Sequence, residues 1–381
     1  MVVWHLPCES RSSPGPYTKG QSIRTGPFLL ACPRRKRLNK TQALAAPTDY
    51  ETLPASTSPC SSRRDTAKMT TQLLHPDVDL AIVGAGASAA ALVTALRESP
   101  TSIAVFEKSR GPGGRLSVRR TALANYNHGG LPGSHESSAV SLESVYKARL
   151  EGRPFSAANS GIKRALSDVS THYGTRIDSI QRTATQWRLV DKDGQTIALS
   201  QALVIALPAP QALALLPEGL PAHWGAQLSK LEYDPAWALM LSFQRAIEEA
   251  KLKIDYGLPL ADFPILRKAN PIAGADLAGS RAWSLIASPQ FSRRALEWAP
   301  DEVVKELLRQ TGIAASDLDE CLAHRWRYAQ PPQAVNAGGF WSEQFRFGAV
   351  GDYFGALPLP PLQRAILSAQ WLAEQIKSSH P

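Results

Sequence analysis

Two glycines and an acid, placed within residues 79–107, have the types and spacing needed to hold a dinucleotide. Gly84 and Gly86 directly follow the apolar run 79–83. The first glycine permits a tight turn, and the second lets a pyrophosphate approach the backbone. Glu107 lies 23 residues after Gly84 (107 − 84), about where an acid binds the hydroxyls of a ribose. Because a carboxylate there would repel a 2′-phosphate, we expect a dinucleotide without one.

A strand, a helix and a second strand must position these residues. Residues 79–83 and 103–106 are apolar runs typical of buried strands. Residues 87–98 are mostly Ala, Leu and Val without proline, which favours a helix. Ser88 and Ala89 lie in the first turn of this helix, where free N–H groups and a partial positive charge suit a diphosphate. The alternative is a glycine turn that binds nothing.

A glycine-rich loop with three cations follows Glu107. It reads Lys108-Ser109-Arg110-Gly111-Pro112-Gly113-Gly114-Arg115. Cations in such a loop usually bind a neighbouring diphosphate, and Arg115 and Arg119 are the candidates here. A domain that holds only a nicotinamide dinucleotide does not need this loop. A long flavin dinucleotide lying across the sheet does, because its diphosphate and ribityl chain require extra donors.

The order of these motifs resembles the flavin amine oxidase superfamily, and within it the renalase-like oxidoreductases. The resemblance covers about residues 78–378 and rests on four segments: Gly113-Gly114-Arg115, Arg119-Arg120, Tyr126-Asn127-His128-Gly129 and Phe347-Gly348-Ala349-Val350-Gly351-Asp352. It implies FAD as the cofactor, with the backbone at Ile177 receiving the adenine and Asp352 meeting the ribityl or pyrophosphate region. With the residues above, the implied FAD-binding set is Gly84, Gly86, Ser88, Ala89, Glu107, Lys108, Gly113, Gly114, Arg115, Arg119, Gly129, Ile177, Gly351 and Asp352.

The resemblance also implies an activity. Hydride would pass from a reduced nicotinamide-type or related small substrate to the flavin, and dioxygen would reoxidise it. Such a transfer needs stacking of donor and flavin rather than an acid or base. His128 is the catalytic candidate, and a hydrogen-bonded structural histidine is the alternative. An amine substrate is the family-level alternative, and it would call for an aromatic cage beside the flavin.

Two departures from the family bear on activity. Residues 134–150 form a much shorter segment than the family's insert, which shapes the substrate pocket. In the last helix, where the family often has Glu-Gly-Ala-x-x-Ser-Gly, this chain has Leu362-Gln363-Arg364-Ala365-Ile366-Leu367-Ser368-Ala369. The shortened segment motivates a further alternative, a non-catalytic FAD-binding protein that kept the cofactor site and lost its pocket.

The basic residues of the chain gather in its first part. Residues 1–68 hold 11 Lys or Arg and 4 Asp or Glu, a balance of +7 (11 − 4), whereas the remainder holds 31 and 29, a balance of +2 (31 − 29). The near-neutral remainder argues against a nucleic-acid partner. We expect residues 1–76 to be disordered, as a transit peptide, a regulatory arm, or a segment ahead of a true start at Met69.

The number of cysteines and the length of the apolar runs indicate where in the cell the protein would be found. Cys321 is the only cysteine beyond the basic segment, so we expect no disulfide framework or metal site and a cytoplasmic location. No apolar run approaches 18 residues, so no membrane span is expected. The expected partner is a small-molecule substrate.

We therefore predict an α/β fold: a Rossmann-type FAD/NAD(P)-binding domain with an inserted β meander, and a smaller α+β substrate domain. The FAD-binding domain would span 77–218 and 336–381, and the substrate domain 219–335. The meander strands are expected at 175–183, 186–191 and 196–206, with Asp193-Gly194 as a turn. Helices are expected over 157–173 and over 301–311, the latter capped by Asp301.

Overall fold

The computed structural model describes residues 77–129, 156–247, 265–269, 280–331 and 333–379. The basic segment 1–76 and the shortened segment 134–150, on which two sequence predictions rest, lie outside the described residues.

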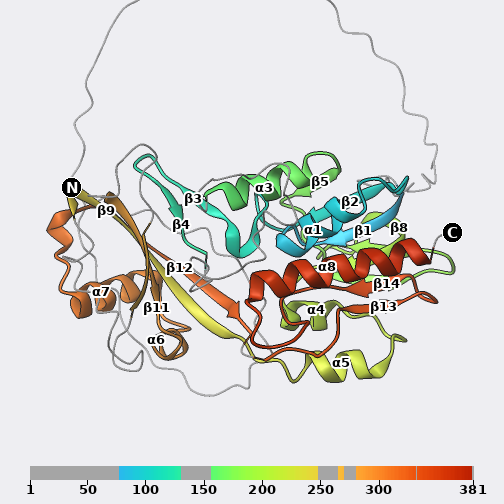
Figure 1. Cartoon of the computed structure of the whole chain (residues 1–381). Helices are drawn as coiled ribbons and strands as arrows, with labels where there is room; N and C mark the ends of the chain where they lie inside the picture. Colours follow the sequence, from blue (N-terminus) through green and yellow to red (C-terminus); the bar gives the residue numbers. More distant parts are fainter. Residues whose placement is uncertain (1–76, 130–155, 248–264, 270–279, 332, 380–381) are drawn as a thin grey trace, which may run out of the picture. The chain divides into compact units, whose positions relative to one another are not determined.

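In the described residues, an eight-stranded sheet joins the first and last parts of the chain (Figure 1). Five of its strands are parallel, in the spatial order β5–β2–β1–β8–β14. Along the chain these are β1 (Val78–Val83), β2 (Ile103–Glu107), β5 (Ser170–Tyr173), β8 (Thr196–Ile205) and β14 (Phe347–Ala349). The resulting order, 3-2-1-4-5, is that of the Rossmann fold, in which the ligand binds beyond the carboxyl ends of the strands where the order reverses.

The remaining strands of this sheet are antiparallel. β13 (Phe340–Ser342) pairs with β14 at one edge. β7 (Trp187–Val190) pairs with β8 and with β6 (Ser179–Arg182), which confirms the inserted meander. Gly194 adopts φ +79° in the turn between β7 and β8, as the predicted Asp193-Gly194 turn requires.

Helices cover one face of the sheet, and helices and aromatic side chains cover the other. α1 (Ala87–Ala95), α3 (Ser156–Leu166) and α8 (Pro361–Ser378) pack on the face that carries Leu80 and Ile82. Figure 1 shows α8 beside α1. α4 (Ala209–Leu215) and α5 (Ala222–Leu228) share a core with the opposite face, where the rings of Trp224 and Phe340 stack at 4.8 Å. Because β1 and β2 are largely buried on both faces, they read as continuous apolar runs, whereas the edge strand β5 is polar and largely exposed.

An antiparallel sheet occupies the middle of the chain, in the order β10 (Ile265–Ala269), β11 (Ser280–Ala287), β9 (Asp234–Ile247) and β12 (Leu318–Gln330). Side chains alternate between its faces. Trp237, Leu239 and Leu241 pack with α6 (Pro289–Arg294) and α7 (Pro300–Thr311). Ala238 and Met240 belong to clusters on the other face.

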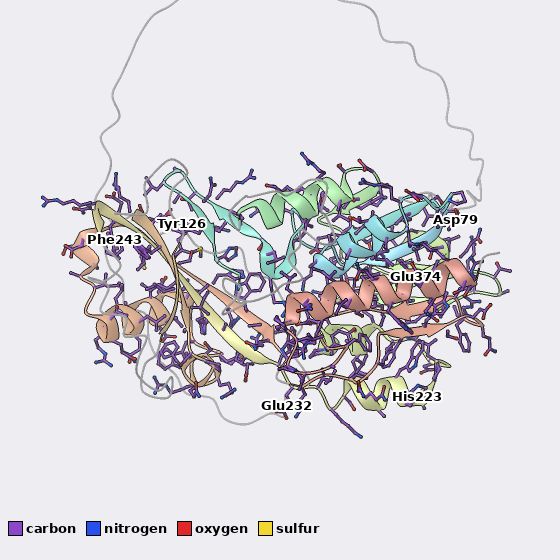
Figure 2. All side chains as sticks on the ribbon, in the orientation of Figure 1. Asp79, Tyr126, His223, Glu232, Phe243 and Glu374 are labelled. Atoms are coloured by element: carbon purple, nitrogen blue, oxygen red, sulfur yellow. The ribbon has the colours of Figure 1, made fainter. Side chains whose placement is uncertain are left out.

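A hairpin after the glycine-rich loop covers part of that second face. The loop ends in a short 3-10 helix, η1 (Gly114–Leu116), followed by β3 (Val118–Arg120) and β4 (Asn125–Asn127). Tyr126, labelled on the hairpin in Figure 2, is fully buried against Met240 and Leu322. The hairpin therefore connects the Rossmann sheet to the middle sheet.

The predicted fold class is confirmed, and two local predictions are wrong. The helix expected over 157–173 ends at Leu166, because residues 170–173 form β5 and complete the hydrogen bonds of β2. Asp301 does not cap α7. Ala299 is the N-cap and donates its N–H to the Glu302 carboxylate at 2.8 Å, since Pro300 takes the first helical position that proline favours. The domain boundaries at 218/219 and 335/336 remain predictions.

We predict that Leu372→Ala lowers the free energy of unfolding by about 2–5 kcal/mol, because Leu372 is fully buried between α8 and the sheet. Leu367 lies on the same helix but is 39% exposed, so Leu367→Ala should change stability by less than about 0.5 kcal/mol. Denaturant unfolding of both variants measures the difference. Equal losses would mean that α8 does not pack as described.

Candidate functional site

The turn after β1 has a backbone conformation that only glycine adopts easily at its first position, Gly84. Gly84 adopts φ +105°, and a Cβ there would lie 2.6 Å from the carbonyl oxygen of Ala206. Gly86 is different: its backbone is extended, and a Cβ there would meet no described atom within 4 Å. Ala89 is fully buried and Ser88 nearly so. The turn is thus closed at its first glycine and open at its second.

The N-terminus of α1 lies at this opening. Gly86 is the N-cap, makes no side-chain cap, and no acid occupies the first turn of the helix. The first N–H groups of a helix have no partner within it, and they carry a partial positive charge. A diphosphate that approached Gly86 would meet these groups without competition from a carboxylate of the same turn.

Glu107 holds the turn with both carboxylate oxygens. One oxygen accepts from the N–H of Ala85 at 2.9 Å, and the other from the N–H of Ser109 at 2.8 Å. The backbone carbonyl of Glu107 accepts from the N–H of Thr175 at 2.9 Å, two residues before the buried Ile177. The acid therefore ties together the turn, the start of the glycine-rich loop and the segment expected to meet adenine. Its remaining lone pairs are those that a ribose would use.

The glycine-rich loop lies directly against the turn. The N–H of Gly113 donates to the carbonyl of Ala85 at 2.8 Å, and a Cβ on Gly114 would lie 3.7 Å from the Cα of Gly86. Gly113 has φ +122°, and its neighbour Pro112 accepts from the side-chain amide of Asn159 at 3.1 Å. The structure thus brings together the turn and the Gly-Gly-Arg motif. Lys108, at the start of the loop, is exposed.

Arg115 connects this loop to the Gly-Asp motif near the end of the chain. Its guanidinium lies 2.8 Å from the carboxylate of Asp352, 237 residues later (352 − 115), and also donates to the carbonyl of Ala329 at 2.5 Å. Asp352 is 2% exposed and accepts from the hydroxyl of Tyr233 at 3.0 Å. Burial alone would lower the pKa of Arg115, but the charge of Asp352 raises it. Gly351, the preceding residue, donates its N–H to the hydroxyl of Ser368 at 3.3 Å.

Gly129 and His128 fix the chain that leaves the hairpin. A Cβ on Gly129 would lie 1.7 Å from the carbonyl oxygen of Arg115, so only glycine fits. The carbonyl of His128 accepts from the indole N–H of Trp326 on β12 at 2.7 Å. Gly129 therefore lies against the glycine-rich loop, and His128 is bound to the middle sheet.

Three rings meet beside this contact. The His128 ring lies 4.8 Å from that of His324 and 5.4 Å from that of Trp326, and the last two are 4.6 Å apart. His324 and Trp326 are cross-strand partners of Ala238 and Ala236 on β9, so the rings occupy the face away from α6 and α7. We refer to His128, His324 and Trp326 as the ring cluster.

Within the ring cluster, the imidazole of His324 is uncharged near physiological pH. Burial, together with the charges of Arg119 and Arg325, lowers the pKa of His324 to about 4. Arg119 therefore acts on the ring cluster from β3, whereas no described contact links it to the turn at Gly84 and Gly86. Its predicted part in binding a diphosphate remains a prediction.

Sequence reasoning missed three contributors to this site. Tyr233 binds Asp352, Asn159 binds the glycine-rich loop, and His324 completes the ring cluster. Their distant partners lie at least 47 positions away along the chain: Asp352 for Tyr233, Pro112 for Asn159 and His128 for His324.

The part of the chain that the structure describes contains neither a candidate metal site nor a candidate membrane span. Within the described ranges, no three His, Cys, Asp or Glu side chains are grouped so that they could hold a metal ion. Of the helices the structure describes, none combines the length and apolar character needed to cross a bilayer.

We predict that Arg115→Met lowers the free energy of unfolding by about 3 kcal/mol, because it leaves the buried Asp352 carboxylate with Tyr233 alone. Arg110→Met, in the exposed part of the same loop, should change it by less than about 0.5 kcal/mol. The double variant Arg115→Met/Asp352→Asn should recover most of the loss. Denaturant unfolding of the four proteins tests this, and equal stability of the two single variants would contradict it.

We predict that His324 makes stability fall as pH decreases from about 6.5 to about 4. Its folded pKa lies below its ordinary value, so in this window the unfolded chain binds a proton that the folded chain does not. The loss reaches on the order of 3 kcal/mol at the acid end. Unfolding at a series of pH values, compared with His324→Phe, isolates this contribution. Parallel curves for the two proteins would show that His324 titrates normally.

The chain is similar to a known domain family over part of its length and to solved structures over most of it. Residues 82–136 match the family described as an NAD(P)-binding Rossmann-like domain. Wild-type putrescine oxidase bound to putrescine matches with a TM-score of 0.54 at 13% identity, over 80% of this chain and 100% of that chain. Cyclohexylamine oxidase from Brevibacterium oxydans IH-35A matches with a TM-score of 0.52 at 12% identity, over 80% of this chain and 99% of that one. The chain therefore has a Rossmann-like nucleotide-binding unit within the fold of these oxidases.

Proposed function

We propose that this protein is an FAD-dependent oxidoreductase. The observation that carries the proposal is the contact of the Gly-Gly-Arg loop with two distant motifs: Gly113 binds the dinucleotide turn, and Arg115 pairs with Asp352. Together with Glu107, these residues follow the carboxyl edge of the sheet from β2 to β14. Three strand spacings separate those strands, roughly 14 Å, which suits an extended dinucleotide better than a mononucleotide.

The residues present fit FAD. The open space at Gly86 and the uncapped N-terminus of α1 suit the diphosphate, and Glu107 suits the adenosine ribose. The positive charge of Arg115 lies on the far side of the turn from Glu107, where a longer ligand continues. When bound, FAD would supply the hydride acceptor, while the chain's own residues bind and orient it. The proposed binding residues are Gly84, Gly86, Ser88, Ala89, Glu107, Lys108, Gly113, Gly114, Arg115, Arg119, Gly129, Ile177, Gly351 and Asp352.

For the substrate we propose a reduced nicotinamide-type or related small heterocycle, with dioxygen as acceptor. The ring cluster supports this choice because the indole of Trp326 and the neutral imidazole of His324 can stack with a flat heterocycle. We retain His128 as the catalytic candidate because its ring contacts those of His324 and Trp326. The names of the similar structures, putrescine oxidase and cyclohexylamine oxidase, favour an amine as the second candidate. The cysteine usage supports a cytoplasmic location.

A spectrum followed by anaerobic titration tests the proposal. Purified protein that is yellow, or becomes yellow with FAD, and bleaches anaerobically with isomers of reduced NAD would support the renalase-like activity. Bleaching with putrescine or cyclohexylamine instead would favour the amine oxidase. Yellow protein that no reductant bleaches would favour a non-catalytic FAD-binding protein. Protein that takes up no FAD would refute all three.

We predict that Gly86→Ala lowers the affinity for FAD at least ten-fold without lowering stability. The extended backbone of Gly86 accepts a Cβ, and no described atom opposes it, but the methyl group would occupy the approach of the diphosphate. Gly111→Ala is the matched control, because a Cβ at Gly111 also meets no described atom within 4 Å. Quenching of flavin fluorescence measures both dissociation constants. Equal affinities of the two variants would place the diphosphate elsewhere.

A further inference from the structure

Arg119 lies on the side of the β3–β4 hairpin that faces the middle sheet. It is paired with Tyr126 in the hairpin register, and residues directly opposite each other on antiparallel strands share one face. Tyr126 is fully buried against Met240 and Leu322 of the middle sheet. Arg119 itself is neither buried nor fully exposed. It therefore combines a position against the middle sheet with a surface that a ligand can reach.

The ring cluster lies within reach of the charge of Arg119. Tyr126, its hairpin partner, precedes His128 by two residues (128 − 126). On β12, Leu322 precedes His324 by the same interval, so the two lie on one face of that strand. Burial, together with charges that include that of Arg119, lowers the pKa of His324. The ring cluster is therefore a place of positive potential.

The neighbouring Arg120 lies on the opposite face of the same strand. It is paired with Asn125 in the hairpin register and is exposed. Burial, with the charge of Arg120, lowers the pKa of Lys163 on α3. Two adjacent arginines thus carry the same charge in opposite directions, and only Arg119 is on the side of the ring cluster.

Two other charged groups near the ring cluster already have partners. Arg325 lies on the face of β12 away from the ring cluster, 3.4 Å from the carboxylate of Glu297. Glu320 is on the same face as the ring cluster, but it is buried and accepts from the hydroxyl of Thr121 at 2.9 Å. The side chain of Arg119 makes no ion pair with any residue that the structure describes. Its guanidinium is therefore the charge that a substrate can use.

A guanidinium beside stacking rings favours one kind of substrate. A flat heterocycle would stack with the ring cluster, and an anionic group of the same molecule would lie against Arg119. The planar donors of a guanidinium match the oxygens of a phosphate. The ammonium group of an amine would instead be repelled by this charge.

We propose that Arg119 selects the substrate by binding its phosphate, so that a phosphorylated heterocycle is preferred to the same heterocycle without phosphate and to an amine. This inference rests on the proposed function and names the residue that reads the substrate's charge. Contact with the diphosphate of FAD is the competing role of Arg119, and the experiment separates the two roles.

Oxidised nicotinamide mononucleotide and nicotinamide riboside are the probes, because they differ only by the phosphate and neither can reduce a flavin. Calorimetry on the FAD-loaded protein should show the mononucleotide binding about ten-fold more tightly, as a charge-assisted hydrogen bond provides. In Arg119→Met and Arg119→Gln the ratio of the two affinities should fall to near one, and Arg119→Lys should keep part of the preference. Arg120→Met removes the same charge from the opposite face and should change the ratio less than about two-fold.

Anaerobic bleaching of the flavin gives a second readout. The reduced mononucleotide should bleach Arg119→Met about ten-fold more slowly than wild type at low concentration, whereas the reduced riboside should bleach both proteins alike. A wild-type affinity ratio near one, or a ratio unchanged in both neutral variants, would overturn the inference. A ten-fold loss of FAD affinity with an unchanged ratio would overturn it too, and would assign Arg119 to the cofactor. The proposed function survives these results if the wild-type protein binds FAD and a substrate bleaches it. Wild-type protein that takes up no FAD would overturn both.

Discussion

The ion pair between Arg115 and Asp352 is the interaction on which the proposed site depends. It joins a loop near the first strand to a motif that follows the last parallel strand, and both partners are largely shielded from water. A buried ion pair adds little net stability. Each partner nevertheless offsets the cost of burying the other's charge, so removing one partner alone is destabilising. Tyr233 and the carbonyl of Ala329 complete the polar surroundings. The pair therefore fixes where the glycine-rich loop lies relative to β14 and β12.

Around this pair, the Rossmann sheet and the middle sheet contribute different parts of the site. The Rossmann sheet supplies the turn, Glu107 and the N-terminus of α1 at its carboxyl edge. The middle sheet supplies His324 and Trp326 from one face of β12, next to His128. A ligand held by the first would therefore present its far end to the second. This division suits a cofactor on one side and a small substrate on the other.

The sequence predicted those parts of the fold that local chemistry determines. Gly84 could be assigned because a tight turn after a buried strand requires glycine, and the Rossmann-type domain followed from the strand-helix-strand unit and the late Gly-Asp motif. The predictions failed where distant partners decide. Residues 170–173 leave the helical pattern only because the edge of β2 is there to pair with. Asn159 and Tyr233 contribute through contacts that no local pattern encodes.

A crystal structure of the protein with FAD tests the central claim most directly. We expect the adenosine ribose against Glu107, the diphosphate at Gly86 and the N-terminus of α1, and the flavin ring on the β14 side, next to Arg115. Electron density that showed the space at Gly86 filled by side chains, or FAD running in the opposite direction along the sheet edge, would contradict the account.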